Sequence, residues 1–585
     1  MKARTVTIRP TLAAMVAAEV VGIAAYVALP PARFTWWPFA AITVVTLVLL
    51  LVRVHRRNFA TWVAARVRWW RTRRYATGVG AAIDIGHGNE VYGVRTAGDE
   101  AVTVIRVDGR PYEPTFLRGS TMSLTRNLLP LEVLTRFFDQ PGGLRLSVDV
   151  VSMGYRVRPG SGYPELYSTL LADRGAAGQR TTYVIVRLVI SESLSGLVYR
   201  KSVGSAAAAA TDRIVKALAQ EGVRAVALNA EEHDAVLARL SLGLAAPPTR
   251  PVVADLVDDD EGEDRVVELV GAAVGGAEES RSRRRRRGGK DKPAQAAEEE
   301  QPQRVPAAVN VGWSLVDKQP GYVTSYFFSP EDISTATFHQ MWALRSDDVV
   351  HVLMLRKQGD TVVVSAMMRT NDPRPPEEPP TLYLNKLPGA QYEAALRSAP
   401  VSAPQLGLPT RPLPDDLEIP VGATGVLVGA ALRDDLAGQL QIQRDDLVMM
   451  ALTDPQRSTR ITMDTSDFYV RQVLIRAAAA GERIAIYSRN PRTWYSVSQP
   501  NIAVVEPGRR AEFVPTIVVN DHAPVAPPVG LSSTMITVGR SSSAKPDIVF
   551  QQMSPNAVRI RNGAQAIDVS VVEFRQEQTW TGTAT

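Results

Sequence analysis

The sequence of 585 residues contains no cysteine. This absence excludes disulfide bonds, cysteine-ligated zinc, iron–sulfur clusters and thiol catalysis. It suits a body in the reducing cytoplasm, although many exported proteins also lack cysteine. The chain must therefore be stabilised by packing and polar contacts alone.

The sequence also lacks the common nucleotide and hydrolase motifs. No Gly-x-x-x-x-Gly-Lys-Ser/Thr loop is present, and Gly78-x-Gly80 lacks the third glycine of a dinucleotide fingerprint. There is no Gly-x-Ser-x-Gly elbow, and no two histidines have metal-ligand spacing. Adjacent acids could hold a metal, but solvated turns explain them better. These pairs are Asp347–Asp348, Asp434–Asp435 and Asp445–Asp446. We expect no catalytic residue, no cofactor and no metal.

Positive charge is concentrated at the N-terminus. The whole chain has a formal net charge of +6. Residues 1–75 contain twelve Lys or Arg and a single acid, Glu19, so the remainder is net negative. A basic N-terminal end before an acidic body argues against a nucleic-acid-binding protein.

Two apolar runs near the N-terminus predict membrane helices over about residues 12–29 and 34–52. The link between them, residues 30–33, allows only a tight hairpin. Basic residues flank both outer ends of the pair, which places both termini in the cytoplasm and makes the protein a multi-pass protein of the inner (plasma) membrane. Trp36 and Trp37 then lie at the outer membrane interface, where aromatic rings are enriched.

The first apolar run has a stripe of small residues at intervals of four. Ala14, Ala18 and Gly22 would allow close helix approach in lipid, although the run is also simply rich in alanine. Glu19 is costly in the membrane unless it is protonated or paired, so we expect it to pack against a polar group of another protein, with a proton-relay role as the alternative.

Aromatic residues continue after the second run. Trp62, Trp69 and Trp70 recur among arginines at roughly helical spacing. This pattern predicts an amphipathic helix in the inner headgroup layer, in contact with membrane lipid. Packing against a partner subunit is the alternative.

The rest of the chain has an α/β pattern in two parts. We predict cytoplasmic α/β domains over 77–246 and 309–585, the second with a β-rich C-terminus, after a membrane-associated segment over 1–76. Residues 247–308 are rich in like-charge blocks and predict a disordered charged linker. The clearest helices are expected over 206–220, before Gly222, and from a Thr465 or Ser466 cap to residue 480, before Gly481.

Several segments together resemble one protein family. They are Val-Asp-Gly-Arg-Pro-Tyr-Glu-Pro-Thr over 107–115, Asp-Val-Val-Ser-Met-Gly-Tyr-Arg-Val over 149–157, Arg-Thr-Thr-Tyr-Val-Ile-Val-Arg over 180–187, Ile-Pro-Val-Gly-Ala-Thr-Gly-Val-Leu-Val-Gly over 419–429, and the helix over 468–480. With the N-terminal hairpin, and in this order, they resemble EccE, a membrane component of the mycobacterial type VII (ESX) secretion system.

The resemblance implies a structural role. EccE proteins join EccB, EccC and EccD in an inner-membrane complex that exports WXG100, PE and PPE proteins, and EccC is its ATPase. The family implies no catalytic residue, no small-molecule substrate and no nucleic acid. The alternative is a membrane-tethered enzyme such as a sugar-nucleotide transferase, because α/β domains also host such chemistry.

Overall fold

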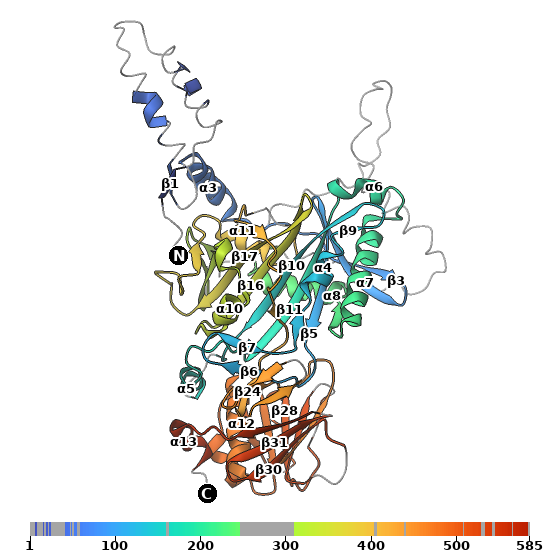
Figure 1. The fold of residues 1–585 in the computed structure, drawn as a ribbon, viewed down its shortest axis with the longest axis vertical. Helices are drawn as coiled ribbons and strands as arrows, with labels where there is room; N and C mark the ends of the chain where they lie inside the picture. The colour runs from blue at the N-terminus through green and yellow to red at the C-terminus, as the bar shows by residue number, and fades with distance from the viewer. Residues whose placement is uncertain are drawn as a thin grey trace, which may run out of the picture.

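A computed structural model gives the fold (Figure 1). The residues that it describes are 6–8, 16, 19–21, 23–24, 41–46, 48, 52–54 and 59–582, apart from 159–162, 246–308, 403–405, 438–439, 507, 528–529, 531–532, 541–544 and 564. Two large sheets, one above the other in the figure, form the body.

Within the described residues, the first sheet has fourteen strands, and all of their pairings are antiparallel. Its main path runs β13-β14-β15-β17-β16-β10-β11-β5-β4-β3, and β9, β12, β18 and β19 pair at its sides. The strands are β3 (Ile83–His87), β4 (Glu90–Ala97), β5 (Glu100–Asp108), β9 (Asp139–Gln140), β10 (Leu144–Tyr155), β11 (Gln179–Val189), β12 (Arg224–Ala227), β13 (Val309–Val311), β14 (Val316–Lys318), β15 (Gly321–Phe328), β16 (Asp348–Gln358), β17 (Thr361–Asp372), β18 (Leu384–Lys386) and β19 (Arg411–Pro412).

Helices cover both faces of this sheet, so its long strands are buried on both sides. Along β10, Val148 and Val150 pack into the core with α4 (Leu131–Thr135), α7 (Val203–Gln220) and α10 (Thr335–Gln340). Val151 and Met153 point to the opposite core, with α8 (Ala230–Leu240) and α11 (Gln391–Arg397). The alternation follows from the two-residue period of a strand. A short helix, α6 (Leu194–Leu197), follows β11.

The first sheet joins residues on both sides of the charged segment over 246–308. Central strands β10 and β16 pair antiparallel from Val148↔Leu355 to Gly154↔Val349. The segment that the sequence predicts as a boundary between domains therefore separates two parts of one sheet.

The second sheet is mixed and has twelve strands in the part of the chain that the structure describes. Its order is β27-β26-β28-β29-β25-β30-β31-β32-β21-β24-β6-β7, parallel from β27 to β30 and antiparallel beyond. The strands are β6 (Thr115–Arg118), β7 (Met122–Leu124), β21 (Val426–Ala431), β24 (Leu447–Met450), β25 (Thr459–Asp464), β26 (Ile484–Ser488), β27 (Ile502–Val505), β28 (Ile517–Asp521), β29 (Thr534–Val538), β30 (Ile548–Ser554), β31 (Ala557–Asn562) and β32 (Gln565–Ser570). Two further pairs are β8 (Leu128–Leu129) with β20 (Ile419–Pro420), and β22 (Asp435–Ala437) with β23 (Leu440–Ile442).

The helix at the centre of the second core is α12 (Asp467–Ala479), which packs with α5 (Tyr163–Leu170) and α13 (Gln578–Thr581). Ser466 caps it by accepting from the backbone N–H of Tyr469, and Gly481 follows with φ +105. The predicted helix and its cap are confirmed here, as is the mixed α/β class.

The predicted helix over 206–220 corresponds to α7, which begins three residues earlier. Ser202 and Ser205 form a reciprocal capping box, and Gly222 follows the helix with φ +74. Five consecutive alanines let the helix approach the sheet closely, where Thr211 and Thr103 share a 2.6 Å hydrogen bond. Capping and a terminal glycine thus set both ends of α7.

Most of the two apolar runs over 12–29 and 34–52 lies outside the described residues. Within the part of the chain that the structure does describe, no helix is both long enough and apolar enough to cross a bilayer. The flanks of the runs are described: β1 (Val6–Ile8) pairs antiparallel with β2 (Val52–Val54). Helix α3 (Phe59–Thr72) then leads into the first sheet.

Candidate functional site

Connections between the two sheets meet at one junction. Residues 109–114 lead from β5 of the first sheet to β6 of the second, and residues 421–425 lead from β20 to β21. The two connections touch, since a Cβ added at Gly422, which has φ +73, would lie 3.3 Å from the backbone nitrogen of Gly109. Two of the segments that carry the family resemblance thus meet where the sheets join.

Asn127 links both connections. Its side-chain oxygen accepts from the backbone N–H of Arg110 at 2.6 Å, and its amide nitrogen donates to the carbonyl of Arg110 at 3.3 Å. Its own carbonyl accepts from the backbone N–H of Val421. A Cβ added at Gly109 would lie 2.6 Å from the Asn127 amide nitrogen, so close approach requires glycine at this position.

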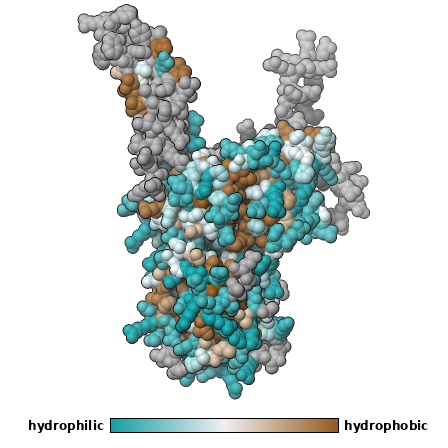
Figure 2. Space-filling model, viewed as in Figure 1, coloured by the Kyte–Doolittle hydropathy of each residue, from teal (hydrophilic) through white to brown (hydrophobic). Residues whose placement is uncertain are grey.

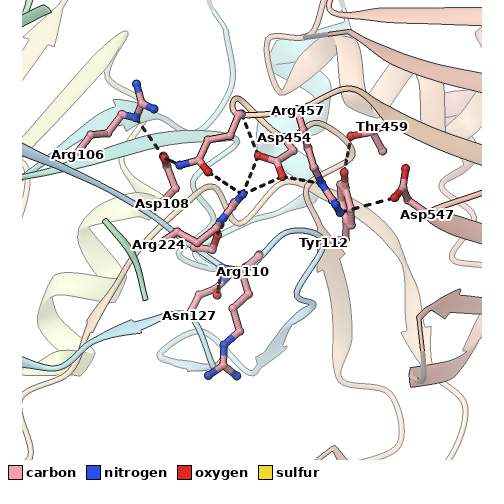
Figure 3. A network of polar contacts seen from close by, with 12 residues as sticks. Arg106, Asp108, Arg110, Tyr112, Asn127, Arg224, Asp454, Arg457, Thr459 and Asp547 are labelled. Carbon is pink, nitrogen blue, oxygen red and sulfur yellow. Dashed lines mark hydrogen bonds and ion pairs between the residues drawn. The ribbon is translucent and has the colours of Figure 1, made fainter. Parts of the chain in front are cut away.

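A polar network extends from this point into the second sheet (Figure 3). The Arg224 guanidinium donates to the Gly109 carbonyl at 2.6 and 2.9 Å and to the carboxylate of Asp454 at 2.9 and 3.1 Å. The Asp454 side chain is fully buried. Because Arg224 belongs to β12 and Asp454 precedes β25, this ion pair ties the two sheets together.

Tyr112 provides a second tie. Its hydroxyl lies 2.5 Å from the hydroxyl of Thr459, and its carbonyl accepts from the Asn562 side chain at 3.2 Å. The Arg457 guanidinium lies 5.7 Å from the centre of the Tyr112 ring. Burial is the main cause of the raised pKa of Tyr112, so this hydroxyl stays protonated at neutral pH.

The end of β10 meets the end of α12 beside the same junction. The backbone N–H of Arg158 donates to the carbonyl of Ala479 at 2.9 Å. A Cβ at Gly481 would lie 2.2 Å from the hydroxyl of Tyr155, so glycine is required there for space as well as for its positive φ. The segments over 149–157 and 468–480, both part of the resemblance, are therefore in contact.

A buried charge cluster lies in the first sheet. The carboxylate of Asp149 accepts from Arg187 at 2.7 Å and from Arg397 at 2.8 Å, and Arg187 also pairs with Glu100 at 3.0 Å. Burial alone would raise the pKa of Asp149, but Arg397 and Arg187 outweigh it and hold that pKa below its usual value. The cluster joins β10, β11 and α11 across the charged segment.

A matching cluster lies in the second core. The fully buried Arg476 of α12 makes two hydrogen bonds to Glu577, at 2.7 and 2.8 Å, and donates to the carbonyl of Leu427 at 3.1 Å. Tyr163 donates a short hydrogen bond to the same carboxylate. A bidentate pair with further donors satisfies the buried charges and fixes α5, β21, α12 and the C-terminal segment in one arrangement.

Helix α3 is held against the body on one side. The indole nitrogen of Trp69 donates to the carbonyls of Val311 and Gly312 at 3.2 and 3.1 Å. The rings of Trp62 and Trp69 each lie 5.7 Å from that of Trp313. Trp70, by contrast, is 61% exposed on the other side of the helix. The three tryptophans that the sequence predicts at the membrane interface are thus divided between two faces.

The other residues predicted at the site belong to the N-terminal apolar runs and the link between them. Glu19 is exposed, whereas Ala14, Ala18, Gly22, Trp36 and Trp37 lie outside the described residues. In the described part of the chain, no three His, Asp or Glu side chains are close enough together to hold a metal ion.

The acidic pairs have separate structural environments. Asp446 is buried and accepts two hydrogen bonds from Arg118, at 2.7 and 2.9 Å. Asp434 accepts from the backbone N–H of Arg444, and burial raises the pKa of Asp348. Asp446 therefore differs from the solvated turn residue that the sequence suggests.

Sequence reasoning missed the residues that make the junction. Arg224, Asp454 and Asn127 are distant in the sequence and have no motif of their own. Gly109 and Gly422 did lie in segments that resemble the family, and that shared signal could have suggested that the segments meet.

Comparisons with known proteins give one consistent family. The model of the EccE family, described as a "type VII ESX secretion system translocon", matches residues 176–265, which include β11, α7 and α8. The ESX-2 secretion system protein EccE2 of Mycobacterium tuberculosis (strain CDC 1551 / Oshkosh) is 25% identical over 421 residues. That match covers 72% of this chain and 64% of EccE2, so the chain spans less than two thirds of this relative.

Two ESX-5 proteins are matched over more of their own length. The ESX-5 secretion system protein EccE5 of Mycobacterium marinum is 23% identical over 67% of this chain and 87% of its own. EccE5 of Mycobacterium tuberculosis (strain ATCC 25618 / H37Rv) is 24% identical over 67% of this chain and 89% of its own. These matches agree with the family model, and the chain is similar to EccE proteins of type VII secretion systems over about two thirds of its length.

Proposed function

We propose that this chain is a structural subunit of a type VII (ESX) secretion complex in the inner membrane, where it stabilises the assembly with EccB, EccC and EccD. One observation carries the proposal: similarity to proteins named as ESX secretion system components extends over 67–72% of the chain. A match of that length covers most of the body, so the similarity extends beyond one shared module.

Membrane anchoring by a two-helix hairpin is part of the proposal. The antiparallel pairing of β1 with β2 supports it, because this pairing brings the two flanks of residues 9–51 side by side. Exposed hydrophobic residues occur at the described positions of both apolar runs, including Val20 at 59% and Val44 at 57% (Figure 2). Such a surface is costly in water and favourable in lipid. In such a hairpin the positive-inside rule would put both basic flanks, and with them both termini, in the cytoplasm.

Helix α3 would transmit this anchoring to the body. On the inner face of the helix, Trp69 packs against Trp313 of the body. On the outer face, the side chains of Val63, Val67 and Trp70 are 46%, 44% and 61% exposed. Arginines flank these apolar side chains, which suits contact with anionic headgroups. A rigid α3 would then fix the height and orientation of both sheets relative to the membrane.

The enzyme alternative is not favoured. The relatives are named as secretion system proteins, and the buried charges described above serve to join elements of the fold. Structural joining is the role that these contacts explain directly.

Affinity purification of the full chain in mild detergent, from a host with an intact ESX system, tests the proposal. Recovery of EccB, EccC and EccD in a complex of fixed composition is the expected result. Recovery of the folded chain alone, under conditions that keep the other three subunits together, would contradict it.

The small-residue stripe gives a sharper test of the anchoring. Replacing Ala14, Ala18 and Gly22 with Leu should lower recovery of the complex, because bulk on that stripe blocks close helix approach. Ala13→Leu with Ala24→Leu is the matched control, since these positions lie off the stripe at helical spacing. Equal recovery of both variants would remove the stripe from the assembly interface.

A further inference from the structure

A large cleft lies between the two sheets. Its volume is about 620 Å³, and its walls come from both sheets and from both connections of the junction. A volume of 300–1,000 Å³ is usual for small-molecule sites. Arginines predominate among its polar lining residues, which also include Tyr155 and Tyr183.

The cleft has a strong excess of positive charge. Seven of its lining residues are arginines, and four are Asp or Glu. Three of these four acids form ion pairs: Asp108 with Arg106, Glu113 with Arg126, which lies outside the cleft, and Asp454 with Arg224. The fourth, Glu482, accepts hydrogen bonds from the side chains of Gln179, Thr453 and Thr516. The carboxylates of the cleft therefore do not neutralise the positive charge of several of its guanidinium groups.

Five arginines of the cleft form no ion pair with any residue that the structure describes. Arg180 is the most enclosed of them: it donates to the carbonyl of Gly422 at 2.6 Å and of Val421 at 3.5 Å, both neutral acceptors. Burial lowers the pKa of Arg180 to about 9, so it is still charged at neutral pH. The other four are Arg110, Arg158, Arg239 and Arg483.

Two of these arginines lie close to one tyrosine. Burial raises the pKa of Tyr155, and the positive charges of Arg158 and Arg239 oppose that rise. Both arginines are exposed, so they can reorient toward a ligand. Tyr155 and Tyr183 both keep their protons at neutral pH, because burial raises both pKa values, and their hydroxyls can donate hydrogen bonds.

We propose that this cleft binds a small, soluble molecule that carries two or more phosphate groups. Guanidinium forks match phosphate oxygens in geometry and charge, and several of them around one cavity favour a polyanion over a single carboxylate. The ligand would contact both sheets and hold them together. Helix α3 and the N-terminal strands lie at the opposite end of the first sheet from the second sheet, which favours a soluble phosphate over a lipid headgroup (Figure 1). No reaction is implied, and the site is independent of the secretion role.

The test is calorimetric titration of sodium tripolyphosphate, and separately of ATP, into the full chain in mild detergent at constant ionic strength. One site per chain is the expected result. The Arg158→Glu, Arg239→Glu double variant should weaken binding at least tenfold, because both residues are exposed and their reversal opposes the ligand's charge. Arg374→Glu with Arg492→Glu, both exposed and outside the cleft, is the control and should stay within twofold of the unchanged chain.

Thermal melts without ligand check that each variant is folded. Failure of both phosphates to bind up to about 1 mM, the limit of weak affinity, would overturn the proposal. Equal weakening by the cleft and control variants would also overturn it, since it would indicate non-specific charge attraction. The same titration with phosphatidylglycerol bicelles separates the two phosphate sources: binding of bicelles alone would overturn a soluble ligand. None of these readouts depends on secretion.

Discussion

Asp149→Asn gives the most direct test of how the first sheet is held together. The side chain is 1% exposed and accepts hydrogen bonds from two arginines, at 2.7 and 2.8 Å. Asparagine has the same shape but no charge, and its amide group presents N–H donors to a guanidinium. The change leaves Arg187 and Arg397 with Glu100 as their remaining carboxylate, at 3.0 Å from Arg187.

The expected cost follows from the burial of both arginines. Removing one partner of a buried ion pair costs about 3–5 kcal/mol. At about 2 °C per kcal/mol, the value for large domains, the melting midpoint of the first sheet should fall by about 6–10 °C. Burial lowers the pKa of Arg397 to about 10, so Arg397 keeps its charge at neutral pH. Loss of a proton from Arg397 therefore does not reduce the destabilisation that the substitution causes.

The measurement is a thermal melt of the full chain in mild detergent at pH 7.5. The pKa of Asp149 is lowered in the folded state, so its stabilisation is complete above the ordinary Asp pKa of about 3.9 and is lost as the pH falls through the lower folded value. Asp360→Asn, in the exposed turn between β16 and β17, is the control and should melt like the unchanged chain. A midpoint for Asp149→Asn within about 2 °C of the unchanged chain would refute the reasoning.

Three further predictions concern other contacts. Trp313→Ala should speed tryptic cleavage within α3 several-fold, because it removes the ring against which the helix packs; cleavage is followed by mass spectrometry, and equal rates would contradict the packing. Gly109→Ala should lower the unfolding free energy by about 1–3 kcal/mol through overpacking against Asn127, whereas Gly86→Ala, with open space, should not; denaturant melts compare them. Burial and the charge of Arg180 lower the pKa of His351 to about 3, so protonation of this histidine in the unfolded chain should remove about 2 kcal/mol between pH 6.5 and pH 5. Burial also lowers the pKa values of His233 and His339, so His351→Phe should reduce the slope of unfolding free energy against pH without removing it, and an unchanged slope would contradict the assignment to His351.

Local features of the fold could be predicted because their signals are local. The expected C-terminal end of α7 came from Gly222, and both expected ends of α12 came from a Thr465 or Ser466 cap and from Gly481. The serine cap of α7 was not predicted, and that helix begins three residues earlier than expected. In each case the deciding interaction lies within a few residues of the element, so the sequence pattern contains it.

Long-range pairing could not be predicted in the same way. The apolar strands β10 and β16 give no sign in their sequences that they are neighbours, and the charged segment between them suggested two separate domains. Arg187 and Arg476 resemble surface residues until their partners are known, because their burial depends on carboxylates that distant elements supply. The junction combines both difficulties, since Arg224 and Asp454 are each defined by the other.

The pairing order of the sheets constrains how the chain folds as the ribosome makes it. Strand β10 can pair with β16 only after β16 has been synthesised, and β6 can pair with β24 only after β24 has been synthesised. At about 5–20 residues per second, the roughly 200 residues between β10 and β16 take about 10–40 seconds to synthesise. Through that interval the apolar edge of β10 next to β16 is unpaired, and such edges promote aggregation. Glu577, which neutralises Arg476 in the second core, emerges later still. Both sheets therefore close late in translation, and the nascent chain should depend on chaperones until its C-terminal third is complete.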